Sequence, residues 1–226
     1  MQIEMEIIAT MKNKFTEKFG IPRQSGMIEE TEGRIVFEGR YRNPDYVRGL
    51  EGFSHIWLLW IFSENRNISA AATVRPPRLG GNTRIGVFAT RSPYRPNPVG
   101  LSCVRLEKIE MTESGPELIV RGADIMNGTP IIDIKPYLSY ADRIEDATGR
   151  LADEYHRIPV IIPEEMEAKL HEGERDEVKK ILSLDPRPAY QQDNRIYGMC
   201  YGNKNIRFRA ENGMLVVVDI EERRKG

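Results

Sequence analysis

Three prolines within six residues fix the backbone between two apolar segments of this chain. Pro93, Pro96 and Pro98 lie in the sequence FATRSPYRPNPVGLS, with IGVFA at its start and VGLSCVRL at its end. Proline locks φ, removes a backbone donor and pushes the preceding residue into an extended conformation, so this segment is not a helix. Two interpretations stay open: a rigid connection between core strands, or a stiff loop that presents Arg91 and Arg95 to a ligand.

Charge is distributed unevenly along the chain, although 33 Lys and Arg residues against 34 Asp and Glu residues give a formal net charge of −1. No acidic residue occurs from Asn65 to Leu106, and every cation in that segment is an arginine. These are Arg66, Arg75, Arg78, Arg84, Arg91, Arg95 and Arg105. The guanidinium group suits bidentate contacts to phosphate or carboxylate. The segment therefore predicts a phosphate-binding face, the alternative being that these arginines pair with acids elsewhere on the folded surface.

Short apolar segments separated by turns fill the first 140 residues. Strands are predicted over residues 3–10, 33–39, the end of 46–62, 85–90, 99–111, 116–125 and part of 126–138. No helical period interrupts them, so the fold class is mainly β, an antiparallel barrel or sandwich. The pattern argues against a Rossmann fold, because no G-x-G-x-x-G stands between a strand and a helix and strands do not alternate with helices.

The character of the sequence changes near residue 141. Residues 163–186 have helical apolar spacing, with acids early and lysines late, and residues 207–220 predict a hairpin with Asn212-Gly213 in its turn. We therefore expect two domains, a β domain over residues 1–140 and a small α+β domain over residues 141–226.

Several chemistries have no support in the sequence. It contains no nucleophile elbow, no P-loop and no H-E-x-x-H motif. Cys103 and Cys200 lie far apart and outside any C-x-x-C pair, so neither a zinc site nor a disulfide framework is expected. His55 is interpreted as a satisfied core or rim histidine more readily than as a base. Asp124, which follows a predicted strand, is equally open to capping the next turn and to catalysis.

Composition and termini bear on location. The chain has 226 residues, of which 40% are hydrophobic and 30% charged, as in ordinary globular proteins. No apolar run is long enough to span a membrane, and the acidic N-terminus is unlike a signal peptide. We expect a cytoplasmic protein with no membrane partner.

Five segments occur in an order that resembles a known family. They are PRQSG, GLEGFSHIWLLWIF, TVRPPRLGGNTRIGVFATRSPYRPNPVGLS, NGTPIIDIKPY and DPRPAY. Together they resemble the TrmO family of tRNA (adenine-N6)-methyltransferases, also called TsaA-like or YaeB-like. The resemblance implies a compact antiparallel β-barrel that binds S-adenosyl-L-methionine, in a homodimer with the cofactor near the subunit interface. It also implies a tRNA substrate whose anticodon arm carries threonylcarbamoyl-adenosine at position 37, next to the anticodon.

The resemblance also carries cofactor contacts onto particular positions. These are Pro22, Arg23, Gln24, Ser63, Glu64, Arg91, Leu101, Arg121, Gly122, Ala123 and Asp124. Two positions depart from the family pattern. Ser63-Glu64 stands where some relatives have His-Gln, and Asn127 replaces an aspartate common before Gly-Thr-Pro.

These roles lead to a chemical hypothesis. Arg91 would pair with the carboxylate of the methyl donor, and the other arginines would hold phosphates of the anticodon arm. The acceptor nitrogen is a poor nucleophile until its proton leaves, and the candidates for a general base are Asp124 and Asp133; no metal is required. Two alternatives remain: a non-catalytic RNA-binding or regulatory barrel, and a methyltransferase with another acceptor.

Overall fold

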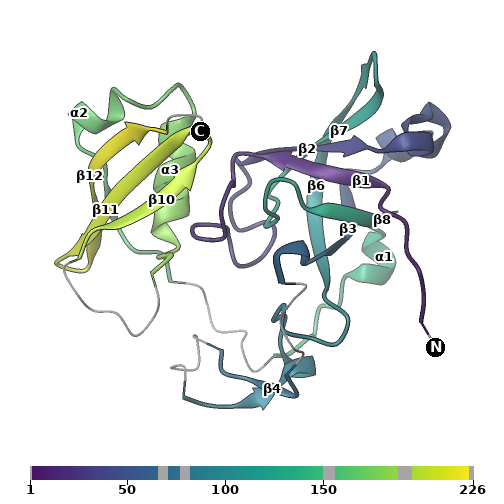
Figure 1. Cartoon of the computed structure of the whole chain (residues 1–226), viewed down its shortest axis with the longest axis horizontal. Coiled ribbons are helices and arrows are strands. Elements are labelled where there is room, and N and C mark those ends of the chain that lie inside the picture. The colour runs from purple at the N-terminus through teal and green to yellow at the C-terminus, as the bar shows by residue number, and fades with distance from the viewer. Residues whose placement is uncertain (1, 66–70, 77–81, 150–155, 188–194, 224–226) are drawn as a thin grey trace.

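A closed barrel of six strands forms the N-terminal part of the protein, which the computed structural model describes over residues 2–65, 71–76, 82–149, 156–187 and 195–223 (Figure 1). The strands are β1 (Ala9–Asn13), β2 (Glu32–Phe37), β3 (His55–Ile61), β6 (Val99–Thr112), β7 (Gly115–Arg121) and β8 (Pro130–Pro136). They pair in the order β1-β2-β7-β6-β3-β8, and every pairing between neighbours is antiparallel. The predicted mainly β fold with a compact antiparallel barrel is confirmed.

Alternation of side chains fills the barrel interior. In β3, Ile56, Leu58 and Trp60 are buried, while the residues between them are more exposed. Opposite them on β6, Val104 and Ser102 pair with Ile56 and Leu58 and are also buried. Because successive side chains of a strand point to opposite faces, this register directs one face of each strand inward.

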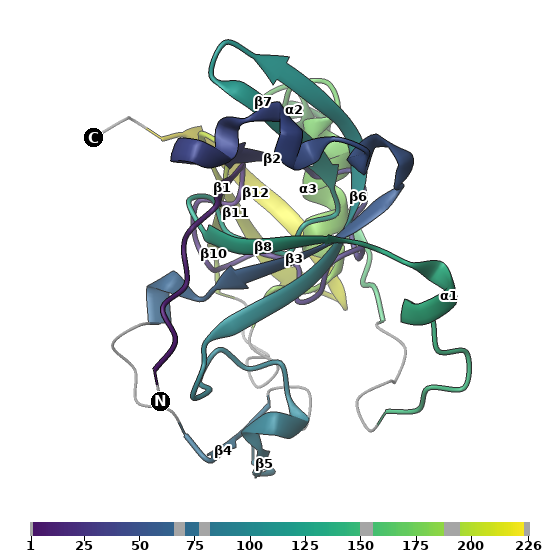
Figure 2. The ribbon, with the colours of Figure 1, turned by 90° about the vertical axis from the view of Figure 1, so that its right-hand side faces the viewer.

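A second sheet with helices on it follows the barrel in the sequence and lies to one side of it (Figures 1 and 2). Its order is β10-β11-β12-β9, and the short β9 runs parallel to β12. The elements are β9 (Val160–Ile161), β10 (Tyr197–Tyr201), β11 (Lys204–Glu211), β12 (Met214–Glu222), α2 (Glu164–Glu167) and α3 (Glu174–Ser183). The predicted α+β character of this region is confirmed. So is its hairpin: Asn212 and Gly213 both have positive φ, as a tight turn between β11 and β12 requires.

Each sheet encloses its own core. One cluster lies inside the barrel, and the other lies between α3 and the C-terminal sheet. The second cluster also contains Phe15 and Ile28, which belong to the connection between β1 and β2. This connection therefore crosses from the barrel into the core of the C-terminal sheet.

Shorter elements complete the described chain. They are 3-10 helices at Gly39–Arg42, Pro44–Val47, Leu50–Gly52, Ser63–Asn65 and Val87–Ala89, the strands β4 (Thr73–Val74) and β5 (Ile85–Gly86), and α1 (Ser139–Asp142). β4 and β5 pair with each other apart from the barrel, at the lower end of both views (Figures 1 and 2).

Several predicted elements differ from the structure. The first strand begins at Ala9, not residue 3, and its paired residues on β2 and β8 begin there, one residue after the backbone hydrogen bonds of Ile8. The strand predicted over residues 85–90 is a two-residue strand followed by a 3-10 helix. The helix predicted over 163–186 is divided into α2 and α3, because Gly173 adopts a φ of +85° just before α3.

Candidate active site

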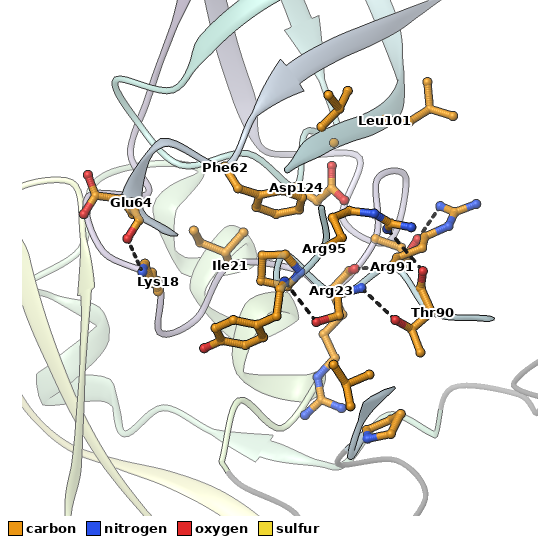
Figure 3. A pocket seen from close by; sticks show the side chains of 18 of the residues that line it. Lys18, Ile21, Arg23, Phe62, Glu64, Thr90, Arg91, Arg95, Leu101 and Asp124 are labelled. Carbon is orange, nitrogen blue, oxygen red and sulfur yellow. Dashed lines mark hydrogen bonds between the residues drawn. The ribbon is translucent and has the colours of Figure 1, made fainter. Parts of the chain in front are cut away.

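A cleft of about 2190 Å³ opens where the barrel, the proline loop and the C-terminal region meet. It is lined by the β1–β2 connection, the end of β3, the segment around β4 and β5, the proline loop and the start of β6. The connection between β7 and β8, and Pro186 and Arg187 after α3, also contribute to the lining. Segments far apart in the sequence therefore share one cavity (Figure 3).

Most of the predicted site residues line this cleft. They are Pro22, Arg23, Gln24, Ser63, Glu64, Arg91, Leu101 and Asp124. Arg121, Gly122, Ala123 and Asp133 are not among its lining residues.

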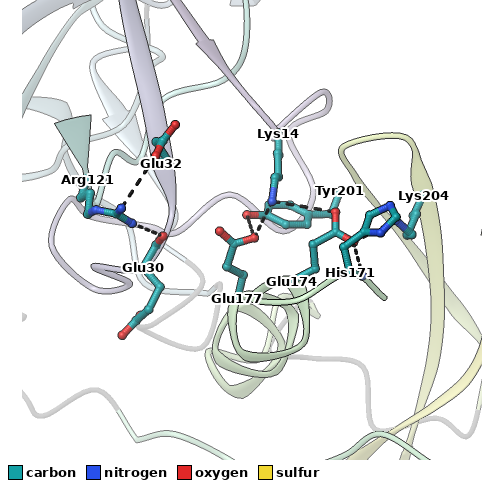
Figure 4. A network of polar contacts seen from close by, with 9 residues as sticks. All are labelled: Lys14, Glu30, Glu32, Arg121, His171, Glu174, Glu177, Tyr201 and Lys204. Atoms are coloured by element: carbon teal, nitrogen blue, oxygen red, sulfur yellow. Dashed lines mark hydrogen bonds and ion pairs between the residues drawn. The ribbon is translucent and has the colours of Figure 1, made fainter. Parts of the chain in front are cut away.

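Arg121 directs its guanidinium group toward carboxylates and a carbonyl outside the cleft. Its Nη1 donates to the carbonyl oxygen of Glu30 at 3.1 Å, and its Nε and Nη2 lie 3.3 Å from Glu107 Oε2 and 3.7 Å from Glu32 Oε2 (Figure 4). With three acceptors around it, Arg121 stabilises the junction of β2, β6 and β7 within this subunit.

Gly122 and Ala123 hold backbone in place beside the cleft. Gly122 has a φ of +76°, donates its amide to Thr31 O at 3.1 Å and accepts from the amide of Gly26 at 2.8 Å. Ala123 is buried in the barrel core. This segment connects β7 to Asp124 and fixes the course of the backbone between the barrel and Asp124.

Asp133 has local partners. Its Oδ1 accepts from the amide of Ile134 at 2.9 Å, and its Oδ2 lies 2.7 Å from Lys135 Nζ. It stands on β8, outside the cleft lining. Of the two carboxylates proposed as a base, only Asp124 lines the cleft.

Asp124 belongs to a polar chain that starts in the barrel. Trp60 Nε1 donates to Ser102 Oγ at 2.9 Å, and Ser102 Oγ donates to Asp124 Oδ1 at 2.5 Å. Ser102 is fully buried. The Ser102 oxygen thus accepts from Trp60 and gives its single hydroxyl proton to Asp124. Burial raises the pKa of Asp124 above its ordinary value, although the Ser102 hydrogen bond and the nearby charge of Arg91 act in the opposite direction.

The proline loop is fastened by its own polar groups. Arg95 Nη1 donates to Thr90 O at 3.2 Å, and the Arg95 amide donates to Pro93 O at 2.9 Å. Arg91 Nη1 donates to Gln24 Oε1 at 2.5 Å, and this hydrogen bond joins the proline loop to the β1–β2 connection. The loop is thus both a connection into β6 and a surface that places two arginines in the cleft (Figure 3).

The cleft lining is strongly cationic. Its cations are Lys18, Arg23, Arg75, Arg84, Arg91, Arg95 and Arg187, whereas its acids are Glu64 and Asp124. Arg105 is different, since it lies outside the lining and 3.6 Å from Glu107. Arg66 and Arg78 lie outside the described residues. The excess of positive charge suits an anionic ligand.

Apolar side chains form another part of the wall. Ile21, Phe62 and Leu101 line the cleft, and Leu101 is 49% exposed (Figure 3). Phe62 packs edge-on against Trp60, with ring centroids 4.3 Å apart. The Trp60 ring in turn lies on Gly100, where an added Cβ would come within 2.2 Å of ring atom Cε2. A residue larger than glycine at this position would displace the ring that anchors Ser102.

Several lining residues have no role in the sequence-based hypothesis, among them Lys18, Phe62 and Arg187. Lys18 donates to the carbonyl oxygen of Glu64 at 3.5 Å, and Phe62 follows the end of β3. Arg187 is held by Asp185 through two hydrogen bonds of 2.8 Å. Arg187 belongs to the DPRPAY motif, which indicated the family. The motif did not predict where the residue lies in the fold, because the approach of Pro186 and Arg187 to the cleft is a tertiary contact.

Other candidate chemistry is not found in the described parts of the chain. No group of His, Cys, Asp and Glu there could hold a metal ion. His55 is exposed at the start of β3, hydrogen-bonded to Ser54, and is not a cleft residue. None of the described helices has the length and apolar character needed to cross a membrane.

The chain is similar to several known proteins, one of them over nearly its whole length. The chain is 36% identical over 231 residues to the tRNA (adenine(37)-N6)-methyltransferase of Escherichia coli K12, covering 97% of this chain and 98% of that protein. It is 44% identical over 168 residues to the protein of the same name from Eikenella corrodens, covering 73% and 95%. A probable S-adenosyl-L-methionine-binding protein of Methanothermobacter thermautotrophicus is 39% identical over 145 residues, covering 64% and 96%.

Solved structures and family models agree with these relatives. A crystal structure of TrmO from Pseudomonas aeruginosa superimposes with a TM-score of 0.79 at 31% identity, covering 98% of this chain and 100% of that one. Residues 10–143 match the family described as tRNA-methyltransferase O N-terminal domain, and residues 155–223 match the TrmO C-terminal domain. By sequence, by fold and over both of its parts, the chain belongs to the TrmO family.

Proposed function

We propose that this S-adenosylmethionine-dependent tRNA (adenine-N6)-methyltransferase acts on threonylcarbamoyl-adenosine at position 37, next to the anticodon. The observation that carries the proposal is the composition of one cleft. Seven cations, an apolar wall and a single partly buried carboxylate, Asp124, meet there. Relatives named as tRNA (adenine(37)-N6)-methyltransferases support the reaction class.

The donor set of the cleft fits S-adenosylmethionine. Arg91 and Arg95 are placed to pair with a carboxylate, and Glu64 can accept from an ammonium group. Ile21, Phe62 and Leu101 offer apolar surface of the kind that adenosine requires. When bound, this cofactor supplies a methyl group on a positively charged sulfur. The residues of the cleft bind it, orient it and reduce the access of water.

Asp124 is the base that this proposal assigns. Its Oδ1 accepts from Ser102, and we assign to the same carboxylate the removal of the proton from the acceptor nitrogen. Burial raises the pKa of Asp124, which makes the carboxylate a stronger base than an exposed aspartate. Alignment of acceptor and donor in one cleft supplies the rest of the acceleration.

The cleft cations that are not assigned to the cofactor are available to bind the RNA. Arg75, Arg84 and Arg187 lie on the lining and can pair with phosphates or with the carboxylate of the threonylcarbamoyl group. An exposed loop nucleotide is the usual target of specific RNA recognition, and a base next to the anticodon meets that requirement. We also propose a cytoplasmic homodimer, as the resemblance to the TrmO family implies.

A transfer assay tests the proposal. The protein is incubated with S-adenosylmethionine carrying a labelled methyl group and with total tRNA, and the nucleosides are then separated. We expect label in an N6-methylated adenosine derivative. Saturable tRNA binding without any transfer would instead support a binding module, and transfer to a different nucleoside would identify another acceptor.

A further inference from the structure

One side of the β1–β2 connection is embedded in the C-terminal sheet. We call residues 14–28 the strap. Phe15 and Ile28, near its two ends, are 3% and 1% exposed and belong to the C-terminal core. Between them, Phe19 stacks on Tyr197 and Phe208, with ring centroids 6.4 Å and 6.3 Å away. Apolar burial therefore fixes the strap to the C-terminal sheet along its length.

Polar contacts tie the start of the strap to the same sheet. The amide of Gly202 donates to Lys14 O at 2.8 Å, and the amide of Cys200 donates to Glu17 Oε1 at 2.7 Å. Lys14 Nζ lies 2.8 Å from Glu177 Oε2, on α3 (Figure 4). The strap thus occupies the edge of β10 and pairs with the helix behind the sheet.

The backbone of the strap also packs closely on the C-terminal sheet at Gly20. This residue has a φ of +93°, and a Cβ added to it would lie 2.4 Å from Met199 Sδ and 2.6 Å from Met199 Cγ. Met199 is buried on β10 and is not a cleft residue. The backbone of the strap therefore lies directly on one side chain of the C-terminal sheet.

The other side of the strap faces the cleft. Residues 21–24 line it, immediately after Gly20 in the sequence. Contact with the barrel resumes where Gln24 Oε1 accepts from Arg91 and Ser25 Oγ accepts from the amide of Cys103 at 3.1 Å. The residues carried over as cofactor contacts from the family, Pro22 to Gln24, are thus supported from behind by another sheet.

We propose that the C-terminal sheet is a positioning element for the cofactor, setting the place of Pro22, Arg23 and Gln24 through the contact between Met199 and Gly20. The inference rests on the proposed binding of S-adenosylmethionine in the cleft. It gives the C-terminal part a role in cofactor affinity that is separate from any contact it makes with tRNA. Met199 acts through the strap and touches no ligand.

A double-mutant cycle on the full chain tests this role. The dissociation constant of S-adenosylmethionine is measured by calorimetry for Gly20→Ala, Met199→Ala and the double variant. We expect Gly20→Ala to weaken binding by about tenfold and Met199→Ala by about fivefold, or roughly 1.4 and 1 kcal/mol. The double variant should bind better than Gly20→Ala alone, because Met199→Ala removes both atoms that the new Cβ would meet.

Gly26→Ala is the matched control. Gly26 is in the same strap with a φ of +77°, so alanine brings similar backbone strain, but nothing lies within 4 Å of an added Cβ. The effects of Gly26→Ala and Met199→Ala on the binding free energy of S-adenosylmethionine should simply add. If the effects of Gly20→Ala and Met199→Ala also add, the proposal is overturned. A Met199→Ala variant that loses thermal stability but keeps its cofactor affinity would overturn it too.

Hydrogen exchange separates this inference from the proposed function. The backbone amides of residues 21, 23, 24 and 25 are followed without cofactor in the wild type and in Met199→Ala. Faster exchange at these amides in the variant supports the positioning role even if calorimetry detects no binding, a result that would count against the proposed function alone. Unchanged exchange would overturn the positioning role.

Discussion

Ser102 donates its hydroxyl proton to Asp124 Oδ1 at 2.5 Å while Trp60 Nε1 donates to the same Ser102 oxygen. The buried barrel interior thereby reaches the cleft through a single hydrogen-bonded chain. Ser102 lies on β6 and is anchored by Trp60 on β3, so the packing of these two strands positions the hydroxyl group that holds the Asp124 carboxylate.

Replacement of Ser102 should change the pH dependence of the reaction. The Ser102 hydrogen bond lowers the pKa of Asp124 against the larger effect of burial, so Ser102→Ala should raise that pKa further. The acid limb of the pH–rate profile should then move to higher pH. Ser102→Thr keeps a hydroxyl and should leave the limb near its wild-type position. A limb that stays in place in Ser102→Ala would show that the titrating group is not Asp124.

Asp124→Asn should reduce the single-turnover rate of methyl transfer by about a hundredfold or more at saturating cofactor and tRNA, as expected for loss of a general base. Saturation separates this effect from weaker cofactor binding. Asp133→Asn is the comparison variant, because Asp133 pairs with Lys135 away from the cleft, and it should keep a near-normal rate. A normal rate for Asp124→Asn would leave alignment alone, or Asp133, as the explanation.

The same asparagine variant should be more stable than the wild type at neutral pH. Burial raises the folded-state pKa of Asp124 above its unfolded value, so the folded wild type is favoured when Asp124 is protonated. That contribution is fully present below the unfolded pKa and is lost as the pH rises through the folded pKa. The excess melting temperature of Asp124→Asn should therefore be largest near pH 7–8 and shrink toward pH 4. An excess that is independent of pH would contradict this origin.

Prediction from sequence succeeded where local pattern decides structure. A long apolar aromatic run predicted β3, alternation of apolar residues predicted β7, and Asn212-Gly213 predicted a hairpin turn. Local pattern also misled. Apolar spacing continues across Gly173, so the break between α2 and α3 was missed, and β10 is too short to stand out before its pairing with β11 is known.

The site divides in the same way. The proline loop and its arginines could be predicted, because proline and arginine act through their own chemistry. The choice between Asp124 and Asp133 could not, since it depends on which strand end opens into the cleft. The insertion of Phe15 and Ile28 into the C-terminal core was likewise hidden, because their partners lie more than a hundred residues away in the sequence.

Arg91→Ala should remove most of the rise in melting temperature that S-adenosylmethionine causes, because a charge-assisted contact to its carboxylate is lost. Arg105→Ala is the matched control. Arg105 belongs to the same acid-free segment but lies near Glu107 and outside the cleft, so this variant should keep the full rise. A full rise in Arg91→Ala would remove the proline loop from the cofactor site.

Arg84→Ala should weaken tRNA binding and reduce the slope of log K against log salt by about one unit, as for one lost phosphate contact. Cofactor affinity should be nearly unchanged. Arg209→Ala, an exposed arginine 3.0 Å from Glu211 on the C-terminal sheet, serves as the control and should leave the slope as it is. Equal slopes for wild type and Arg84→Ala would place the phosphate contacts on other residues.

The most direct measurement of the central claim compares two preparations of the same tRNA, one with and one without threonylcarbamoyl on the adenine next to the anticodon. Labelled methyl transfer is followed under identical conditions. The cationic cleft should pair with the threonylcarbamoyl carboxylate, and a site built for a charged group loses affinity when its own partners are left unpaired. We predict rapid transfer to the modified tRNA and little or none to the unmodified one. Equal transfer to both preparations, or transfer to the unmodified tRNA alone, would contradict the account.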